Sequence, residues 1–178
     1  MMHKERNQVV LVDKDNNQIG VMEKYEAHIQ GKLHRAFSVF ILNHQGEVLL
    51  QQRASEKYHG ANLWTNACCS HQQPQESTLQ AAIDRLDYEM NIQTPLQELF
   101  SFIYRAPVEN NLIEHELDFV LLGYYNQNPI VNPREVKSYK WIAVDQLEEW
   151  MKLKPEQFTY WFKDVWPKVK AYIQKKEA

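Results

Sequence analysis

Cys68, Cys69 and His71 form the most unusual group of chemically active side chains in this sequence. Residues two apart in an extended strand project from the same side, which would bring the Cys69 thiol and the His71 ring to one face. A thiol beside a cation or a metal ion becomes reactive, so this pair could be catalytic. The alternative is that each cysteine is a small buried apolar residue, and this segment alone favours that alternative.

Glu114 and Glu116 are a second candidate pair, within a segment whose other residues favour a strand. The two carboxylates would project from one face of that strand. Carboxylates side by side repel one another unless a cation lies between them or one of them keeps its proton. The alternative is the solvated face of an edge strand, which for an isolated pair is the more common arrangement.

Three histidines could complete a metal site with these carboxylates: His28, His34 and His71. Such a mixture of imidazole nitrogens and carboxylate oxygens suits an octahedral divalent ion such as Mn²⁺, Mg²⁺ or Zn²⁺ better than a sulfur-rich zinc site. Histidine is plentiful, however, and the other four are His3, His44, His59 and His115. Residue types alone therefore do not single out the three.

Glu89 lies at the border of the apolar stripe of a predicted helix, where a carboxylate is costly without a partner. A metal ion would supply one. Arg85, one turn earlier, could instead form an ordinary ion pair with it. Asp84 is expected to point towards solvent.

The elements that must position these groups follow from apolar periodicity. Strands are predicted near residues 9–12, 19–22, 36–42, 47–51, 100–104, 112–125 and 139–144. Helices are predicted over 77–91, 145–152 and 155–175. The first helix has an apolar stripe of Leu79, Ala82, Ile83, Leu86 and Met90, and Asn91 can end it in the left-handed conformation. Strands early and helices late favour an α+β fold, or a mixed sheet with helices packed on it.

Length and composition restrict the class of protein. The 178 residues suit one domain, and we expect it to span residues 1–178. Twenty basic and 23 acidic side chains give a net charge of −3, which offers no general attraction to nucleic acid or anionic membranes. The N-terminal residues are too polar for a secretory signal, and no apolar run is long enough to span a membrane. Two adjacent cysteines cannot form a disulfide framework, so we expect a cytoplasmic protein with reduced thiols.

The segment from Ser70 to Ile92 resembles a degenerate NUDIX box. The usual pattern of that box is G-x5-E-x7-R-E-U-x-E-E-x-G-U, where U is an apolar residue. Serine and asparagine replace its glycines, Asp-Arg replaces its Arg-Glu, and tyrosine replaces one closing glutamate, at Ser70, Asn91, Asp84-Arg85 and Tyr88. NUDIX hydrolases gather Mg²⁺ on the box glutamates, so a chain without most of them is a poor hydrolase candidate.

The chain as a whole resembles the type I isopentenyl-diphosphate isomerase family, which has the NUDIX fold. The similar motifs lie in order at 23–28, 33–37, 52–57, 63–71, 104–106, 114–116 and 158–161. They extend from about Val9 to about Trp166, and an ordered set of this length is specific. The resemblance implies a NUDIX-like mixed β-sheet core flanked by helices, with extra N-terminal strands and C-terminal helices.

The resemblance also implies a reaction and the residues that perform it. The reaction interconverts isopentenyl diphosphate and dimethylallyl diphosphate by adding and removing protons, through a tertiary carbocation-like state, in isoprenoid precursor biosynthesis. The implied metal ligands are His28, His34, His71, Glu114 and Glu116, with a second ion, Mg²⁺, held by Glu89 and the substrate diphosphate. The implied catalytic residues are Cys69, Glu116 and Tyr104. The implied substrate-binding residues are Lys24, Arg53, Lys57, Arg85 and Trp161. Without the resemblance, Trp161 would belong to the apolar stripe of the last helix.

Some positions depart from the family pattern. The gap between His28 and His34 is one residue shorter than in relatives, and Asp84 stands where a basic residue is expected.

A NUDIX pyrophosphohydrolase and a non-catalytic NUDIX binding domain are the two rival functions. We expect a monomer that acts on a small-molecule diphosphate, with no nucleic-acid or membrane partner.

Overall fold

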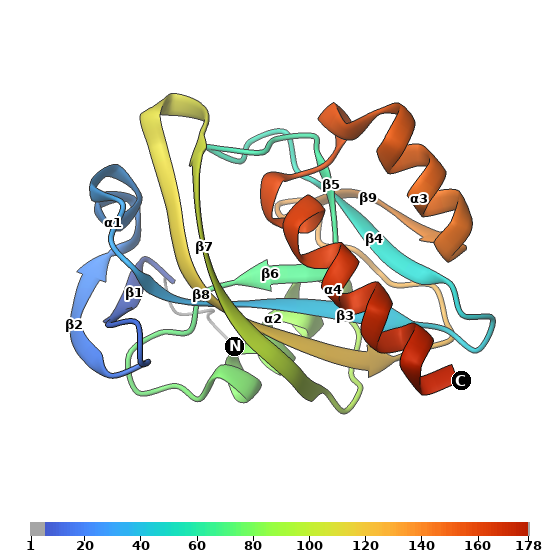
Figure 1. Cartoon of the computed structure of the whole chain (residues 1–178), viewed down its shortest axis with the longest axis horizontal. Helices are drawn as coiled ribbons and strands as arrows, with labels where there is room; N and C mark the ends of the chain where they lie inside the picture. The colour runs from blue at the N-terminus through green and yellow to red at the C-terminus, as the bar shows by residue number, and fades with distance from the viewer. Residues whose placement is uncertain (1–5, 178) are drawn as a thin grey trace.

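The computed structural model describes residues 6–177, and the side chains as far as Lys175, as a nine-stranded mixed sheet with helices on both faces (Figure 1). The strands are β1 (Gln8–Val12), β2 (Gln18–Glu23), β3 (His34–Leu42), β4 (Val48–Arg53), β5 (Trp64–Thr65), β6 (Cys68–Ser70), β7 (Gln97–Val108), β8 (Leu112–Tyr124) and β9 (Val136–Ile142). The helices are α1 (Lys24–Gln30), α2 (Thr78–Met90), α3 (Val144–Leu153) and α4 (Tyr160–Glu177), with short 3-10 turns η1 (Glu109–Asn111) and η2 (Pro155–Gln157). The α+β class expected from the sequence is confirmed.

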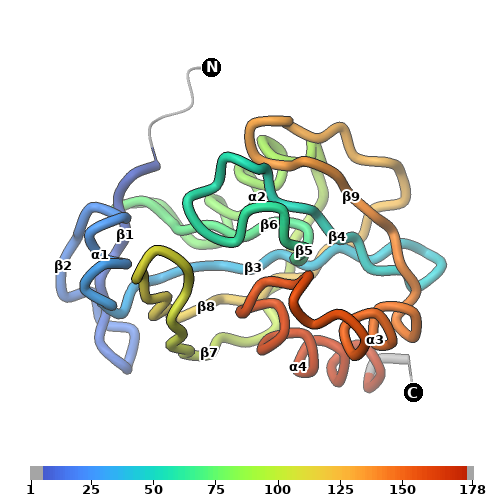
Figure 2. The backbone as a smooth tube through the Cα atoms, turned by 90° about the horizontal axis from the view of Figure 1, so that it is seen from above, coloured from blue at the N-terminus to red at the C-terminus, as the bar shows by residue number. Residues whose placement is uncertain are grey.

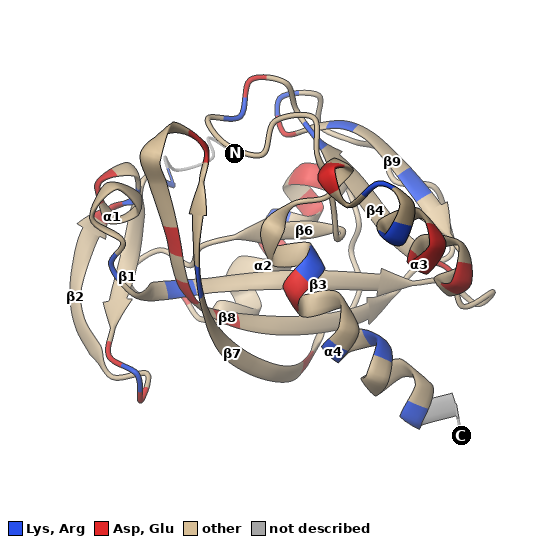
Figure 3. Ribbon diagram, turned by 45° about the horizontal axis from the view of Figure 1, so that its top comes forward, with Lys and Arg blue, Asp and Glu red and all other residues tan. Residues whose placement is uncertain are grey.

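Strand β3 is the centre of the sheet. Its apolar run is buried almost throughout, as expected for a strand with covered faces. Along one side it pairs in parallel with β8, from His34 opposite Glu116 to Leu42 opposite Tyr124. Along its other side it pairs in turn with β1, β6 and β4. The histidine that begins β3 is therefore next to the acidic part of β8, which Figure 3 shows in red.

Alternating side chains of β3 point to opposite faces of the sheet. Phe37, Val39 and Ile41 pack with the buried residues of α2. Phe40 and Leu42 pack with the apolar face of α4. Figure 2 shows the two helices on opposite sides of β3 and β8. Burying each large apolar side chain contributes about 1.5–3 kcal/mol, so both helices are held mainly by packing.

Helix α2 confirms the predicted helix at 77–91. The Ser77 side chain accepts a hydrogen bond from the backbone N–H of Gln80 at its start, and Asn91 ends it with a φ of 52°. One part of the predicted stripe is wrong, because Leu79 is exposed while Ala81 is buried. Leu79 lies in the first turn of the helix. Asp84 points to solvent as expected.

The last helix differs from its prediction. Only η2 follows Pro155, and Phe158 is extended because its backbone bridges to Trp64 of β5. The N–H of Thr159 then donates to the Trp64 carbonyl at 3.0 Å, and α4 begins at Tyr160. The polar stretch after Glu23, which predicted no element, forms α1.

None of the helices in the described part of the chain combines the length and apolar character needed to cross a membrane.

Candidate active site

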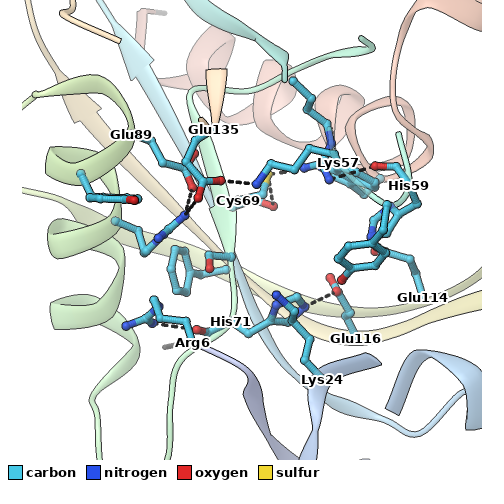
Figure 4. Close-up of a pocket in the computed structure, with 18 residues that line it drawn as sticks. Arg6, Lys24, Lys57, His59, Cys69, His71, Glu89, Glu114, Glu116 and Glu135 are labelled. Atoms are coloured by element: carbon cyan, nitrogen blue, oxygen red, sulfur yellow. Dashed lines mark hydrogen bonds and ion pairs between the residues drawn. The ribbon is translucent and has the colours of Figure 1, made fainter. Parts of the chain in front are cut away.

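A pocket of about 340 Å³ opens beside the N-terminal half of β3. We call it the central pocket, and Figure 4 shows the residues that line it. They are Arg6, Lys24, Phe37, Ser38, Arg53, Lys57, Tyr58, His59, Cys69, Ser70, His71, Arg85, Tyr88, Glu89, Glu114, Glu116, Glu135 and Trp161. Lys24 is labelled beside His71 and Glu116 at one end, and at the other end Lys57 lies with Glu89 and Glu135.

Strand alternation separates the two cysteines. Cys69 is opposite Ser38 of β3, and its side chain reaches the central pocket. Cys68 points to the other face, is fully buried, and packs in the cluster beneath α2. The alternative considered from the sequence, a small buried apolar residue, therefore describes Cys68, whereas Cys69 reaches the pocket.

The same alternation gathers the carboxylates. Glu114 and Glu116 of β8 are both buried and both line the central pocket. Strand β8 lies between β3 and β7, so the alternative that the pair forms the solvated face of an edge strand is wrong.

Three histidines surround Glu116. His34 Nε2 is 3.5 Å and His71 Nε2 is 2.9 Å from Glu116 Oε1, and the His28 and His34 ring centroids are 5.0 Å apart. Ligand atoms of His28, His34, His71 and Glu116 all lie within 4.8 Å of one another. The structure therefore brings together the three histidines that residue types alone did not single out.

The ring orientations of His28 and His34 suit metal binding. Their Nδ1 atoms lie 2.6 Å from the Lys24 carbonyl and 2.8 Å from the Lys32 carbonyl, so each Nδ1 carries the hydrogen. Each Nε2 then presents a lone pair, and both Nε2 atoms are buried without a hydrogen-bond partner in the described chain. Two buried lone pairs aimed at a carboxylate are the arrangement a divalent cation would satisfy.

Burial favours the neutral form of His28 and His71, which metal ligation requires. Burial and the nearby His34 lower the pKa of His28. Burial lowers the pKa of His71 to about 3, although Glu116 acts in the opposite direction.

Tyr104 joins the two carboxylates. Its hydroxyl lies 2.5 Å from Glu114 Oε2 and 2.7 Å from Glu116 Oε2. A hydroxyl has one hydrogen to donate, so one of these contacts needs a proton on the carboxyl group. Burial and the neighbouring Glu116 raise the pKa of Glu114 well above its ordinary value. For Glu116, burial acts the same way, but His34 and His71 outweigh it and hold its pKa low. Of the two, Glu114 is therefore the carboxyl group that binds a proton more readily.

The Cys69 sulfur has a distinct set of partners. Its S–H lies 3.0 Å from Asn66 Oδ1, and the Trp161 indole N–H donates to the sulfur at 3.2 Å. Asn66 is fixed in orientation because its amide nitrogen donates to the carbonyls of Val39 and Cys68. Burial and the nearby Asp118 raise the pKa of Cys69 to about 12, so the group is a neutral thiol at neutral pH.

The other end of the central pocket is rich in cations. Lys57 and Arg85 lie there with Glu135, and Lys24 and Arg53, the other two cations that the resemblance implies for substrate binding, line the same pocket. Arg85 Nη2 lies 2.6 Å from Glu89 Oε1, so the ion pair considered from the sequence is present. Glu89 also accepts a hydrogen bond from Gln51 at 3.0 Å. Burial, followed by the charges of Lys57 and Arg85, lowers the pKa of Lys24.

The sequence analysis gave no role to His59 and Glu135, which line the pocket, or to Asn66, which contacts the Cys69 sulfur. His59 was treated only as one of many histidines, yet its Nε2 is 3.2 Å from Glu114 Oε1. Glu135 forms an ion pair with Lys57 and lies 3.4 Å from Arg85 Nη2. Asn66 holds the thiol. His59 and Glu135 lie in irregular loops, where no periodicity could have marked them.

Comparisons with known proteins agree with this geometry. Residues 32–162 match the family model of the NUDIX domain. The chain is 48% identical over 167 residues to the isopentenyl-diphosphate Delta-isomerase of Pectobacterium atrosepticum, covering 94% of this chain and 93% of that protein. It is 49% identical over 154 residues to the isopentenyl-diphosphate Delta-isomerase of Serratia proteamaculans, covering 86% of each. A crystal structure from Deinococcus radiodurans shares the fold, with a TM-score of 0.67 at 18% identity over 82% of this chain and 89% of that one.

Proposed function

The chain belongs to the family of isopentenyl-diphosphate Delta-isomerases that is built on the NUDIX domain, and we propose that the central pocket is where it acts. The enzyme interconverts isopentenyl diphosphate and dimethylallyl diphosphate, a step of isoprenoid precursor biosynthesis. The observation that carries the assignment of the site is that Cys69 and the Tyr104–Glu116 pair line or border one pocket with both a histidine cluster and four cations.

We assign a divalent ion, Mn²⁺, Mg²⁺ or Zn²⁺, to the histidine end. His28, His34, His71, Glu114 and Glu116 would hold it, which fits the buried Nε2 lone pairs of the first two. When bound, the ion fixes the position of Glu116 and tunes its affinity for a proton.

The cationic end suits the diphosphate. Lys24, Arg53, Lys57 and Arg85 bring four positive charges to the lining of the pocket. Arginine can bind phosphate oxygens through two parallel N–H bonds, while lysine acts as a point charge. We assign to Glu89 a Mg²⁺ ion that accompanies the diphosphate, because its carboxylate is buried beside these cations.

Cys69 and Glu116 provide the acid and the base. One group adds a proton to the terminal methylene, and the electron pair of the double bond forms the new C–H bond. The resulting charge lies on the tertiary carbon. The other group removes a proton from the neighbouring methylene, whose C–H electrons form the new double bond. A neutral Cys69 thiol can donate a proton, and Tyr104 orients Glu116. The reverse reaction exchanges the two roles.

Trp161 shields the developing charge. It is 5% exposed and forms a small cluster with Tyr104 and Cys69. An aromatic face beside a desolvated cation contributes about 2 kcal/mol or more. The same wall excludes water, which would capture the cation as an alcohol.

The rival function, pyrophosphate hydrolysis, fits this pocket less well. A NUDIX hydrolase needs several box glutamates for Mg²⁺, and among the acidic residues of α2 only Glu89 lines the pocket, beside Arg85 and Tyr88. Asp84 points to solvent and Tyr88 replaces a glutamate.

We further propose that residues 1–178 form a single NUDIX-type isomerase domain that acts as a monomer, because every assigned group comes from one chain. Residues 1–5 and 178 lie outside the described part of it. The substrate is a small-molecule diphosphate, with no nucleic-acid or membrane partner. A reducing compartment such as the cytoplasm suits an enzyme that needs a free Cys69 thiol.

Incubation with isopentenyl diphosphate, Mg²⁺ and D₂O, followed by NMR, tests this function. We expect dimethylallyl diphosphate with deuterium in its newly formed methyl group, and no such product from the Cys69→Ser or Glu116→Gln variants. Release of phosphate without movement of the double bond would favour the hydrolase instead. Unchanged substrate in the presence of bound metal would favour a binding domain.

Chelation tests the metal centre separately. Prolonged exposure to a strong chelator should remove activity, and addition of Mn²⁺, Mg²⁺ or Zn²⁺ should restore it. Activity that survives complete removal of metal, checked by elemental analysis, would eliminate the metal centre from the proposal.

A further inference from the structure

His59 contacts the candidate metal centre without belonging to the ligand set assigned above. We propose that it is a positioning residue, which holds the Glu114 carboxylate for the metal ion and joins that carboxylate to the Trp161 wall. The inference rests on the metal centre of the proposed function and adds a residue to it.

The backbone of His59 is fixed from two directions. Arg53 Nη2 donates to its carbonyl at 3.0 Å. The next residue, Gly60, has a φ of 60°, and its N–H donates to Glu109 at the tip of the β7–β8 hairpin at 3.2 Å. Asn110 of the same tip donates to the Tyr58 carbonyl at 2.7 Å. The hairpin that carries Glu114 on β8 therefore also holds the loop that carries His59.

The His59 side chain is 6% exposed and aims at Glu114. Its Nε2 is 3.2 Å from Glu114 Oε1, whereas its Nδ1 is buried without a hydrogen-bond partner in the described chain. A buried N–H without an acceptor is costly, so we place the ring hydrogen on Nε2, facing Glu114. Tyr104 contacts the other oxygen, Oε2. Both oxygens of Glu114 are thus contacted, by groups from two different parts of the chain.

The same ring contacts the hydrocarbon end of the pocket. It meets the Trp161 ring edge-on, with centroids 5.8 Å apart and an interplanar angle of 82°. Arg53, which donates to the His59 carbonyl, also lies over the Trp161 ring at 5.1 Å. A change in the position of Glu114 is therefore transmitted through one buried side chain to the wall that faces the substrate.

A positioning role fits the geometry better than direct ligation. The group of His28, His59 and Glu114 could in principle hold an ion, with ligand atoms within 4.8 Å. The larger group supplies three imidazoles and the Glu116 carboxylate, so we place the ion there. An N–H that donates to a ligating carboxylate is the usual form of support outside the coordination sphere.

The test compares two substitutions at the same site. In His59→Phe the ring volume stays but the donor is lost, whereas in His59→Gln the amide nitrogen can reach the position of Nε2. Loss of such a supporting bond typically weakens metal binding about 10–100-fold, and we expect this for His59→Phe. His59→Gln should recover most of the affinity. Mn²⁺ binding to the metal-free protein, followed by electron paramagnetic resonance, measures both.

Co²⁺ spectroscopy separates positioning from ligation. Because the directly bound atoms are unchanged, we expect the same visible absorption bands and intensities from the Co²⁺ forms of the wild type and both variants. If the Co²⁺ bands of both variants changed in a way that indicates a different coordination number, His59 would be a direct ligand and the proposal would be overturned. Wild-type Mn²⁺ affinity in His59→Phe would also overturn it.

Two controls keep the result interpretable. His44→Phe makes the same change at an exposed histidine away from the pocket and should bind Mn²⁺ like the wild type. Circular dichroism shows whether each variant is folded. If His59→Phe does not fold, His59→Asn replaces it in the test. A Mn²⁺ affinity of His59→Asn equal to that of the wild type would then contradict the proposal. A wild-type protein that binds no Mn²⁺, Mg²⁺ or Zn²⁺ would contradict the metal centre itself, whereas isomerase activity has no bearing on these readouts.

Discussion

The indole N–H of Trp161 donates to the Cys69 sulfur across 3.2 Å, which links the first turn of α4 to strand β6. The contact gives Trp161 two functions. Its ring forms a wall of the pocket, and its N–H holds the sulfur and favours the electron-rich state that follows loss of the thiol proton.

Substitutions of Trp161 separate these two functions. Trp161→Leu removes both the ring and the N–H, and loss of about 2 kcal/mol of cation–π stabilisation corresponds to about a 30-fold decrease in kcat. Trp161→Phe keeps an aromatic face and should retain much more activity. Steady-state kcat values measure the difference, with the melting temperature as a control for folding. Equal losses in the two variants would rule out a role for the aromatic face.

The two adjacent cysteines provide a matched pair. Cys69→Ala removes a proton-transferring group and should lower kcat by about 10²–10⁴-fold with little change in stability. Cys68→Ala should keep the activity but lower the free energy of unfolding by about 1 kcal/mol, because Cys68 is fully buried beneath α2. Urea unfolding and kcat should be measured for both variants. Loss of activity in Cys68→Ala but not in Cys69→Ala would mean that Cys68, and not Cys69, faces the pocket.

Glu135 and Lys57 form an ion pair whose two members should affect substrate binding in opposite directions. Glu135→Gln removes a negative charge near the diphosphate site, so pyrophosphate should inhibit at lower concentration. Lys57→Met removes a positive charge, so inhibition should need a higher concentration. Competitive inhibition constants at two ionic strengths measure this, and both differences should shrink as salt increases. A purely structural ion pair would weaken inhibition in both variants.

The sequence predicted most of the regular elements, because their causes are local. Alternation and apolar runs marked the long strands, and Ser77 and Asn91 marked the ends of α2. The final helix was predicted too long because the Phe158 backbone pairs with Trp64, a residue more than ninety positions away. Contacts of that range leave no periodic signal.

In the candidate site, too, features with a local cause were predicted and features that depend on long-range contacts were not. The pair spacing of Glu114 and Glu116 correctly placed both on one face of a strand, since that follows from the pleat alone. His59 could not be distinguished from other histidines, because its partner Glu114 is brought to it by the β7–β8 hairpin tip. The resemblance to a family supplied the grouping that residue types did not.

Glu148 of α3 joins α4 through two bonds, and this contact predicts a pH dependence of stability. It accepts hydrogen bonds from the Trp166 indole and, at 2.8 Å, from Lys170. Burial alone would raise the pKa of Glu148, but the bonds from Lys170 and Trp166 outweigh it and hold the pKa below its ordinary value of 4.5. The folded state therefore binds the Glu148 proton less readily than the unfolded state. The resulting stability is present above the ordinary pKa and is lost as the pH falls through the lowered one.

Glu148→Gln isolates this effect, because glutamine still accepts from Trp166 but has no charge for Lys170. At pH 7 the variant should be less stable by no more than about 1 kcal/mol, since the ion pair is partly exposed and screened by solvent. Below the lowered pKa the two proteins should have the same stability. Urea unfolding at a series of pH values between 7 and 3 measures both free energies of unfolding. A difference that stays constant over that range would mean that the charge of Glu148 contributes nothing and that only its shape holds α3 against α4.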